Sequence, residues 1–443
     1  MQINERGFPL RGLVTRLLPS FGGTLSAAEL VRIGRSYLQV LAGTGGRLVL
    51  QAVYFLTLAN ALTLAEMGIF ASASAVGIII GAFSGFGFSA IAFQAAAGRQ
   101  RLVGAYFGIF LAASAVTLPI GLAISAPFYL VIFKDSLPLH TFLMIMVVEI
   151  FMFKLVEGLH KVNNGLGRYA RASLLSISMT APRAIGALLF VVIGGSLETW
   201  GNIYFIANGL TVLVGFALFC PRFRISCNVR LLVGRFRDAM LFAFSTLTFD
   251  SQTEVDKLVL IAIAGERAAG IYAISVRIME LAIIPIRTFF VLYSRKLIRE
   301  RRIDEIVSRN LLIEACLFTV SLAGYGAFLV ALSLKPDLLG GNIESARQLF
   351  AMALLVPAFR SLMELHSELY FAYGRLGMQA VVTLALVVLK AAMIALLISM
   401  TANPAVWGFW LNWIFACLYA LSAVAVYGAI SSPLRLAADP RRG

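Results

Sequence analysis

The sequence predicts an all-α polytopic membrane protein of about twelve transmembrane helices, arranged as two parallel six-helix bundles. Its composition, its loop charges and an internal repeat lead to this prediction. The 443-residue chain is 60% apolar and only 13% charged, with a mean hydropathy of +0.88. Soluble proteins average roughly 25% charged residues. The apolar residues also occur in runs of about 20, the length that crosses a bilayer as a helix.

Polar residues, glycine and proline divide the apolar sequence into twelve candidate spans. All should be helices, because an isolated strand in lipid leaves its backbone amides unsatisfied. The third span contains Pro119 and Pro127, and a break near either of them is expected. The spans are Tyr37–Leu58, Gly68–Phe93, Val103–Phe133, Leu139–His160, Ala172–Gly194, Ile203–Cys220, Ala239–Ile263, Ile271–Tyr293, Leu311–Leu334, Leu349–Tyr370, Met378–Met400 and Val406–Ile430.

Basic residues in the loops give the topology. If the N-terminus is cytoplasmic, the inside segments hold 24 basic residues and the outside loops hold four, which are Lys134, Arg267, Lys335 and Arg347. A missed span would invert every later loop and destroy this bias. Because basic residues collect in cytoplasmic loops, both termini are predicted to be cytoplasmic. The same rule explains the net charge of +15, and no nucleic-acid-binding motif is present to suggest that partner.

A short motif occurs twice in the chain. Gly68–Ala71 (GIFA) recurs 202 residues later as Gly270–Ala273 (GIYA), and a glutamate, Glu66 or Glu266, shortly precedes each copy. Six spans per half make the two halves enter the membrane in the same sense, as a parallel repeat. A second echo, at an offset of 207, relates Glu157, Gly167 and Arg168 to Glu364, Gly374 and Arg375. The predicted domains are a cytoplasmic arm (1–36), a first bundle (37–220), a basic cytoplasmic linker (221–238), a second bundle (239–430) and a cytoplasmic tail (431–443).

No enzyme site, metal site or cofactor motif is predicted. His140, His160 and His366 are scattered, and the chain contains neither HExxH nor GxxxxGK[ST]. The four cysteines form no CxxC pair. Without an ATPase motif, any work across the membrane must use an ion gradient, the membrane potential or a substrate gradient.

Charged residues inside the spans are the main functional signal. A charge at the bilayer centre costs about 2.5–3.5 kcal/mol on insertion scales, so such residues face the protein interior or water. Polar stripes on the fourth, seventh, eighth and tenth spans predict a central aqueous cavity. Nine basic residues lie inside or at the edges of spans, namely Arg47, Lys154, Lys161, Arg183, Lys257, Arg277, Arg287, Arg360 and Lys390.

Five of these basic residues are predicted to bind an anionic headgroup, such as a pyrophosphate held in bidentate fashion by arginine. They are Arg47, Arg183, Arg277, Arg287 and Lys390. The alternative is structural pairing, in which Arg277 pairs with Glu280 and Arg360 with Glu364 along a helix. Residues near span ends can instead extend to the membrane surface.

Carboxylates on the seventh span give a second prediction. Asp250 and Glu254 lie one turn apart on one face, and such acidic pairs in a low dielectric suit coupling to H⁺ or Na⁺. Asp256 is a further candidate for coupling. The alternative is that these carboxylates only neutralise Lys257 or an arginine across the cavity.

The region around Asp256 carries a family resemblance. Asp256-Lys257-Leu258, Ala264-Gly265 and then Ala269–Ala273 resemble an Asp in the seventh helix followed by Gly-x-Tyr at the start of the eighth. Ala65–Phe70 resembles the paralogous position in the first half. This pattern is similar to that of the polysaccharide-exporter branch of the multidrug/oligosaccharidyl-lipid/polysaccharide (MOP) superfamily, and the likeness extends over roughly residues 37–430.

The resemblance implies a fold similar to MATE antiporters, with a V-shaped central cavity between two bundles. It also implies a flippase that moves polyprenyl-pyrophosphate-linked O-antigen or exopolysaccharide units across the bacterial inner membrane, in polysaccharide or lipopolysaccharide biosynthesis. Its implied partners are the lipid-linked oligosaccharide, a glycan polymerase and glycosyltransferases. The alternative is a cation-coupled multidrug exporter of MATE type. Because cationic drugs need an acidic cavity, the apparent excess of basic groups favours the flippase. A scaffold that transports nothing has no need of charges inside the membrane.

Overall fold

The computed structural model describes residues 45–281, 306–335 and 339–431, and their regular structure is entirely helical. Each of the twelve predicted spans overlaps a described helix or run of helices, so the predicted fold class is confirmed. The first half contains a helix over 45–61, α3 (Leu64–Gly81), η1 (Ser84–Gly87), α4 (Phe88–Gly98), η2 (Gln100–Leu102), α5 (Val103–Phe128), η3 (Tyr129–Phe133), α6 (Leu139–Val147), η4 (Val148–Met152), α7 (Phe153–Gly165), α8 (Tyr169–Ser178), α9 (Ala181–Ile193) and α10 (Leu197–Phe219).

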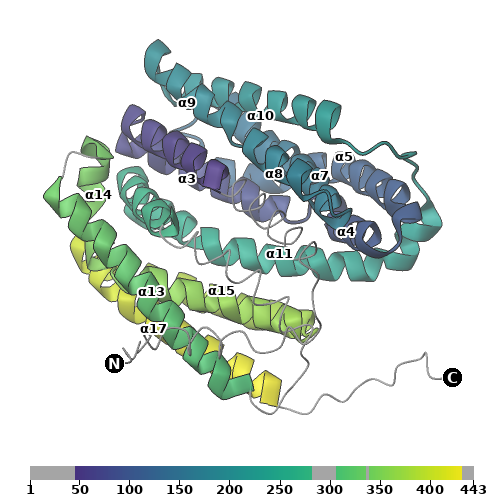
Figure 1. The fold of residues 1–443 in the computed structure, drawn as a ribbon. Helices are drawn as coiled ribbons and strands as arrows, with labels where there is room; N and C mark the ends of the chain where they lie inside the picture. The colour runs from purple at the N-terminus through teal and green to yellow at the C-terminus, as the bar shows by residue number, and fades with distance from the viewer. Residues whose placement is uncertain (1–44, 282–305, 336–338, 432–443) are drawn as a thin grey trace, which may run out of the picture.

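The second half begins with a long helix that packs against both halves. α11 packs on α3 and on α16, and in Figure 1 it runs between the first half above it and the second half below it. The second half contains α11 (Val229–Ala264), a helix over 266–281, α13 (Ile306–Leu334), α14 (Gly341–Met352), α15 (Val356–Ala372), α16 (Leu376–Met400) and α17 (Pro404–Ser431).

The helices have the length and surface of membrane spans. Within the described residues, eight helical segments are long and apolar enough to cross a bilayer, and α14 with α15 forms a ninth candidate. Large apolar side chains such as Val131, Val192 and Val424 are exposed on the helix surfaces. A soluble monomer rarely exposes so much apolar surface. The chain is therefore a multi-pass membrane protein.

Three predicted spans differ from the structure in detail. α5 continues unbroken past Pro119 and Pro127, and a π-turn, η3, directly follows the second proline. Local π geometry of this kind compensates for the backbone bonds that proline removes inside a membrane helix. The second span is interrupted at η1, where Gly85, Phe86 and Gly87 all have positive φ. The tenth span is not straight, because α14 and α15 are bent by 71° at their junction.

The predicted linker 221–238 is partly helical. α11 begins at Val229, where the Asn228 side chain accepts a hydrogen bond from the Arg230 backbone N–H (3.0 Å). This is a standard N-cap, and it starts the helix ten residues before the predicted span. At 1.5 Å per residue, the 36 residues of α11 extend about 54 Å, so the helix projects beyond a hydrocarbon core of about 30 Å.

The two copies of the repeated motif contact each other directly. A Cβ placed on Gly68 of α3 would lie 2.0 Å from the carbonyl oxygen of Glu266, and one on Gly270 would lie 1.8 Å from that of Leu64. Residues 64 and 68 correspond to 266 and 270 in the repeat, so this contact is reciprocal. Such reciprocity is the signature of a two-fold axis. The backbones of the two halves can approach this closely only because both positions are glycine.

We call the contact between Gly68 and Gly270 the glycine crossing. Hydrogen bonds join loops from both halves around it. We call this end of the molecule the outer end, after the topology that the loop charges predict. The Asn60 amide donates to the carbonyl of Leu339 (2.7 Å), and the Asn342 amide donates to those of Ala59 (2.9 Å) and Leu62 (2.7 Å). Ser136, between the third and fourth spans, donates to the carboxylate of Glu266. The two halves are thus held together at the outer end.

The glycine crossing predicts that Gly68→Ala destabilises the protein by about 1–3 kcal/mol, because the added methyl group overpacks the contact with Glu266. Gly209→Ala in α10 is the matched control, since a Cβ there has no neighbour within 4 Å. Thermal unfolding of the purified variants in detergent measures the difference. Equal melting temperatures for the two variants would show that the halves do not depend on this contact.

Candidate substrate site

A row of alternating charges connects the two halves near the middle of α11. On α7, Glu157 accepts from Lys161 (2.7 Å) and also pairs with Lys154 (3.3 Å). Lys154 then reaches Asp250 of α11 at 3.4 Å. The 157–161 and 154–157 spacings place these groups on one face of α7. The row therefore ends in an ion pair between the first half and the second.

A second charged group lies within the second half and exposes an arginine. The Arg277 Nη1 donates to Glu280 (2.8 Å), and the Arg360 Nη2 donates to the other oxygen of the same carboxylate (2.5 Å). The Arg277 side chain is 36% exposed, whereas that of Arg360 is 8% exposed. Two guanidinium groups thus share the Glu280 carboxylate, and the more accessible one has hydrogen-bonding capacity left over.

A third group is fully buried between α11, α16 and the helix over 266–281. Asp256 accepts from the Lys390 ammonium (2.9 Å) and from the Tyr272 hydroxyl (2.5 Å), and Asp256 and Lys390 are 1% and 2% exposed. Lys390 also donates to the carbonyl of Gln252 (2.6 Å). Removing one member of such a pair leaves an uncompensated charge in a low dielectric. This ion pair therefore ties α16 to α11.

Arg183 of α9 is held without an ion pair in the described part of the chain. Its Nε donates to the Asn208 side chain (2.8 Å), and its guanidinium lies 5.0 Å from the Phe153 ring and 5.3 Å from the Tyr204 ring. Cation–π contacts of this kind stabilise a guanidinium without neutralising its charge. The positive charge of Arg183 is thus retained inside the first half.

Arg183 and Arg277 come from opposite halves but act on the same residue. Tyr54, on the helix over 45–61, experiences the charges of both arginines and of Glu149. Glu149 accepts a hydrogen bond from Tyr204 (2.5 Å), and its side chain occupies the space that a Cβ on Gly77 would need. Cationic groups of both bundles thus contribute to the electrostatic field at Tyr54.

The structure places the other predicted headgroup residues differently. Arg47 is exposed, with its Nη1 3.5 Å from the Ser176 hydroxyl. Arg287 lies outside the described residues. Lys390 is occupied by Asp256 and is not accessible to a ligand in this conformation.

The predicted carboxylate pair is divided between two lysines. Asp250 pairs with Lys154, and Glu254 pairs with Lys257 (2.5 Å). Their one-turn spacing is present, but each charge is compensated separately, which agrees with the structural alternative. Lys257 pairs with a carboxylate and Arg277 pairs with Glu280, as expected. Arg360, expected to pair with Glu364 on its own helix, pairs with Glu280 of another helix, and Glu364 also has a partner.

The expectation of a net basic interior needs correction. Eight of the nine predicted basic residues are described, and nine carboxylates accompany them, which are Glu149, Glu157, Asp250, Glu254, Asp256, Glu280, Glu314, Glu364 and Glu368. Excess positive charge is therefore local, at Arg183 and at the arginine pair on Glu280. Counting only the basic residues within the spans concealed this balance.

Sequence reasoning missed Glu149 and the residues that support it. Glu149 lies in η4, a π-turn within the fourth span, and such turns often occur at functional sites. A search for acidic residues inside apolar runs would have found it. The roles of Tyr204, Asn208 and Gly77 depend on contacts between separate helices, and no spacing within the sequence indicates them.

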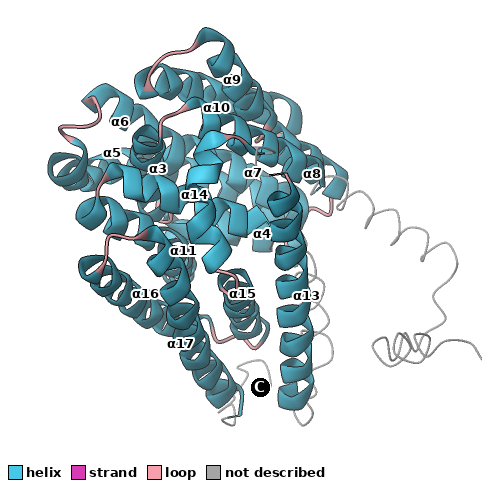
Figure 2. Ribbon diagram, turned by 90° about the vertical axis from the view of Figure 1, so that its left-hand side faces the viewer, coloured by secondary structure: helices cyan, strands magenta, loops and turns pink. Residues whose placement is uncertain are grey.

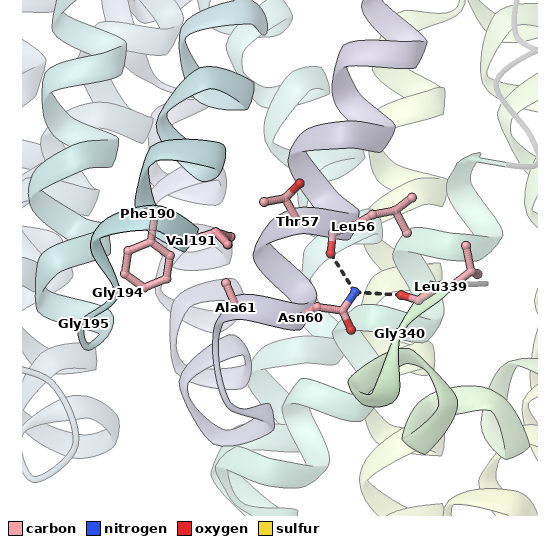
Figure 3. A pocket seen from close by; sticks show the side chains of 10 residues that line it. All are labelled: Leu56, Thr57, Asn60, Ala61, Phe190, Val191, Gly194, Gly195, Leu339 and Gly340. Carbon is pink, nitrogen blue, oxygen red and sulfur yellow. Dashed lines mark hydrogen bonds between the residues drawn. The ribbon is translucent and has the colours of Figure 1, made fainter. Parts of the chain in front are cut away.

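A groove at the outer end is separate from these charged groups. It encloses about 550 Å³ between the helix over 45–61, α9 and the segment that contains Gly340 (Figure 3). Asn60 is its most polar side chain, and its amide donates to the carbonyls of Leu56 (2.9 Å) and Leu339 (2.7 Å). Among the described residues that line the groove, none carries a charge. The predicted V-shaped cavity stays a prediction.

Comparison with known proteins identifies the fold. No family model and no curated protein matches this chain. Among solved structures, a multidrug resistance MATE family transporter of the MOP superfamily in an inward-facing conformation matches with a TM-score of 0.67 at 15% identity, covering 87% of this chain and 94% of that chain. The chain has the MATE-type fold.

Two further solved structures share this fold. An outward-facing structure of a MATE family transporter of the MOP superfamily matches with a lower TM-score of 0.57, at 16% identity over 90% of this chain and 95% of that one. A MOP superfamily transporter from Pyrococcus furiosus, described as having a binding pocket of reverse polarity, matches at 0.56 and 15% identity, over 90% and 95% of the two chains.

The buried pair predicts that Lys390→Met lowers the free energy of unfolding by about 3–5 kcal/mol, because it leaves the Asp256 carboxylate without a cation. The double variant Lys390→Met/Asp256→Asn should recover most of this loss. Exposed His140 and Glu198, 2.9 Å apart, provide the control, since His140→Gln should cost less than about 1 kcal/mol. Denaturant unfolding measures all three. A double variant no more stable than the single one would contradict a compensated charge pair.

Proposed function

We propose that this protein is an alternating-access transporter that moves a polyprenyl-pyrophosphate-linked oligosaccharide across the membrane. The observation that carries the proposal is that each half holds an arginine with unused guanidinium nitrogens, Arg183 beside Asn208 in the first half and Arg277 beside Glu280 in the second. A site made by both halves changes its geometry when the halves rock, as alternating access requires. The outer end is closed in this conformation, so the site is loaded from the opposite end.

The free edges of the two arginines suit a pyrophosphate. Arg277 uses one terminal nitrogen for Glu280, which leaves its Nη2 and Nε for a ligand. Arg183 uses Nε for Asn208, which leaves its two terminal nitrogens. A planar guanidinium binds phosphate oxygens in bidentate fashion with charge-assisted hydrogen bonds. Two such edges match a headgroup with two phosphates.

The remainder of the proposal follows from the substrate. The lipid tail stays in the hydrocarbon phase while the headgroup crosses between the halves. The protein then resides in the bacterial inner membrane with both termini in the cytoplasm. Enzymes that build and polymerise the O-antigen or exopolysaccharide unit, the glycosyltransferases and a glycan polymerase, are its functional partners. Asp250, released from Lys154 when the halves separate, is the candidate for ion coupling.

The second candidate function is a cation-coupled multidrug exporter. The observation in its favour is that the described spans hold nine acidic groups against eight basic ones. Glu149, buried next to Tyr204 and Gly77, provides a carboxylate for a cationic drug. Structures described as multidrug resistance MATE transporters share the fold. A direct comparison of the two substrates therefore has to decide between the functions.

The arginine site predicts that Arg277→Gln and Arg183→Gln each reduce lipid-linked glycan translocation by about 10- to 100-fold. This range corresponds to the roughly 1.5–3 kcal/mol of a hydrogen bond to a charged group. Arg347→Gln is the matched control, because Arg347 also makes a single i,i+3 ion pair, with Glu344 at 3.0 Å, but lies at the outer end. Fluorescent lipid-linked oligosaccharide in proteoliposomes reports the translocation.

The same proteoliposomes should be tested with a cationic drug. Full glycan translocation by both arginine variants would refute the headgroup site. Drug transport by the wild-type protein, without glycan translocation, would establish the multidrug exporter instead.

A further inference from the structure

A buried polar cluster lies in the second half, away from the charged groups described above. Glu314 of α13, His366 of α15 and Tyr419, Ser422 and Tyr427 of α17 meet where these three helices pack together. Figure 2 shows α15 between α13 and α17. Glu314 and His366 are 2% and 1% exposed. The surrounding side chains form an apolar cluster of their own, which includes Leu317, Leu362, Leu369 and Val426.

The hydrogen bonds of this cluster all converge on the Glu314 carboxylate. One oxygen accepts from the Tyr419 hydroxyl (2.5 Å), and the other accepts from the Tyr427 hydroxyl and faces the His366 Nε2 at 3.1 Å. The other ring nitrogen of His366, Nδ1, lies 2.8 Å from the Ser422 hydroxyl. Three donors therefore surround one carboxylate, and a hydroxyl occupies the far side of the imidazole.

This geometry satisfies the histidine in both of its protonation states. In the neutral state, Nε2–H donates to Glu314 and Nδ1 accepts from the Ser422 hydroxyl. In the protonated state, Nδ1–H donates to Ser422, whose hydroxyl only has to rotate. No heavy atom has to move between the two states. A proton from water adds to Nδ1, and the cluster changes from a net charge of −1 to zero.

The charge balance favours this uptake. A carboxylate buried in apolar surroundings without a cation carries a desolvation cost that an adjacent imidazolium offsets. No basic side chain other than His366 pairs with Glu314 in the described residues. α17 carries no charged residue between Pro404 and Ser431. On α16, Lys390 is occupied by Asp256.

The remaining charges on α15 point elsewhere. Glu364 and Glu368 are two positions from His366, roughly 200° around the helix, and so lie on its opposite face. Arg360 pairs with Glu280. The other titratable groups on the helices that meet here are Arg309 of α13, whose side chain lies outside the described part of the structure, Cys316 and Cys417, which are exposed, Tyr325, which donates to the carbonyl of Phe350, and Tyr370 of α15, with Tyr373 in the turn after it.

We propose that His366 and Glu314 form a proton-binding site in which His366 takes up the proton. The site lies about 12 Å from the start of α13 and about 14 Å from the end of α17, at 1.5 Å per residue. Both of these ends are opposite the closed outer end. α15 carries His366 on one face and Arg360, bound to Glu280, on another. Proton binding thus acts on the helix that supports the arginine site, and this coupling role rests on the proposed transport function.

Histidine NMR tests proton binding independently of any transport. The chain has only three histidines, so the variant His140→Gln/His160→Gln leaves His366 as the single imidazole signal. Spectra of purified protein in nanodiscs are recorded from about pH 8 to about pH 5, the range in which an ordinary imidazole gains a proton. If the double variant does not fold, the signal that His366→Gln removes from the wild-type spectrum identifies His366.

The expected result is a His366 signal that moves to its protonated position across this range. Glu314→Gln should abolish the movement, because protonation then buries an uncompensated cation. A His366 signal that stays at its neutral position, or a movement that persists unchanged in Glu314→Gln, would overturn the proposal. A transport assay in which the His366→Gln rate loses its dependence on a pH gradient, with His160→Gln as control, then tests the coupling separately.

Discussion

The backbone contact between Gly68 and Gly270 determines how the two halves sit against each other. Two helices can cross with a carbonyl at the position of a missing Cβ only where neither helix has a side chain. The contact is reciprocal because both glycines belong to the duplicated motif, so one crossing satisfies both halves equally. The hydrogen bonds of Asn60, Asn342 and Ser136 surround this crossing. Separation of the glycines would therefore open the entire outer end.

The interior charges depend on the same arrangement. Lys154 and Asp250 form an ion pair between the halves, so rocking that opens the outer end changes their 3.4 Å separation. Lys390 with Asp256, by contrast, lies within the second half and moves as a unit. Among the described residues, the interior ion pairs are therefore of two kinds. Most lie within one half and hold it rigid, whereas the pair of Lys154 and Asp250 joins the halves and changes when they move. Arg183 and Arg277 lie in different halves, so the same movement would change their separation.

The fold was predictable because its signals are long or repeated. Apolar runs and loop charges gave all twelve spans, and the GIFA/GIYA repeat gave the relation between the halves. The glycine crossing itself was not predictable, since no pattern shows that two repeated segments touch. α5 continues past its prolines because a membrane helix can compensate for the backbone hydrogen bonds that proline removes. This compensation depends on the local helix geometry, which the residue type does not reveal.

The site was predictable only in part. Arg183 and Arg277 were recognised as charges within apolar spans, but Lys390 was assigned a ligand role that its partner on another helix, Asp256, prevents. The Glu314–His366 cluster was overlooked because its members lie on three helices and have no motif spacing. A charge within a span thus often marks a residue inside the fold, as for Arg360 and Lys390, although Arg47 is exposed. Only the packing of separate helices decides what the residue binds.

Cross-linking across the outer end tests the central claim most directly. In a background with the four native cysteines replaced by alanine, Ser136→Cys and Glu266→Cys place thiols on the two halves where their side chains now bond. A short bifunctional, reducible thiol reagent should stop lipid-linked glycan translocation in proteoliposomes, and reductant should restore it. Either single-cysteine variant should be unaffected by the reagent. Full translocation by the doubly labelled, cross-linked protein would contradict a gate at the glycine crossing.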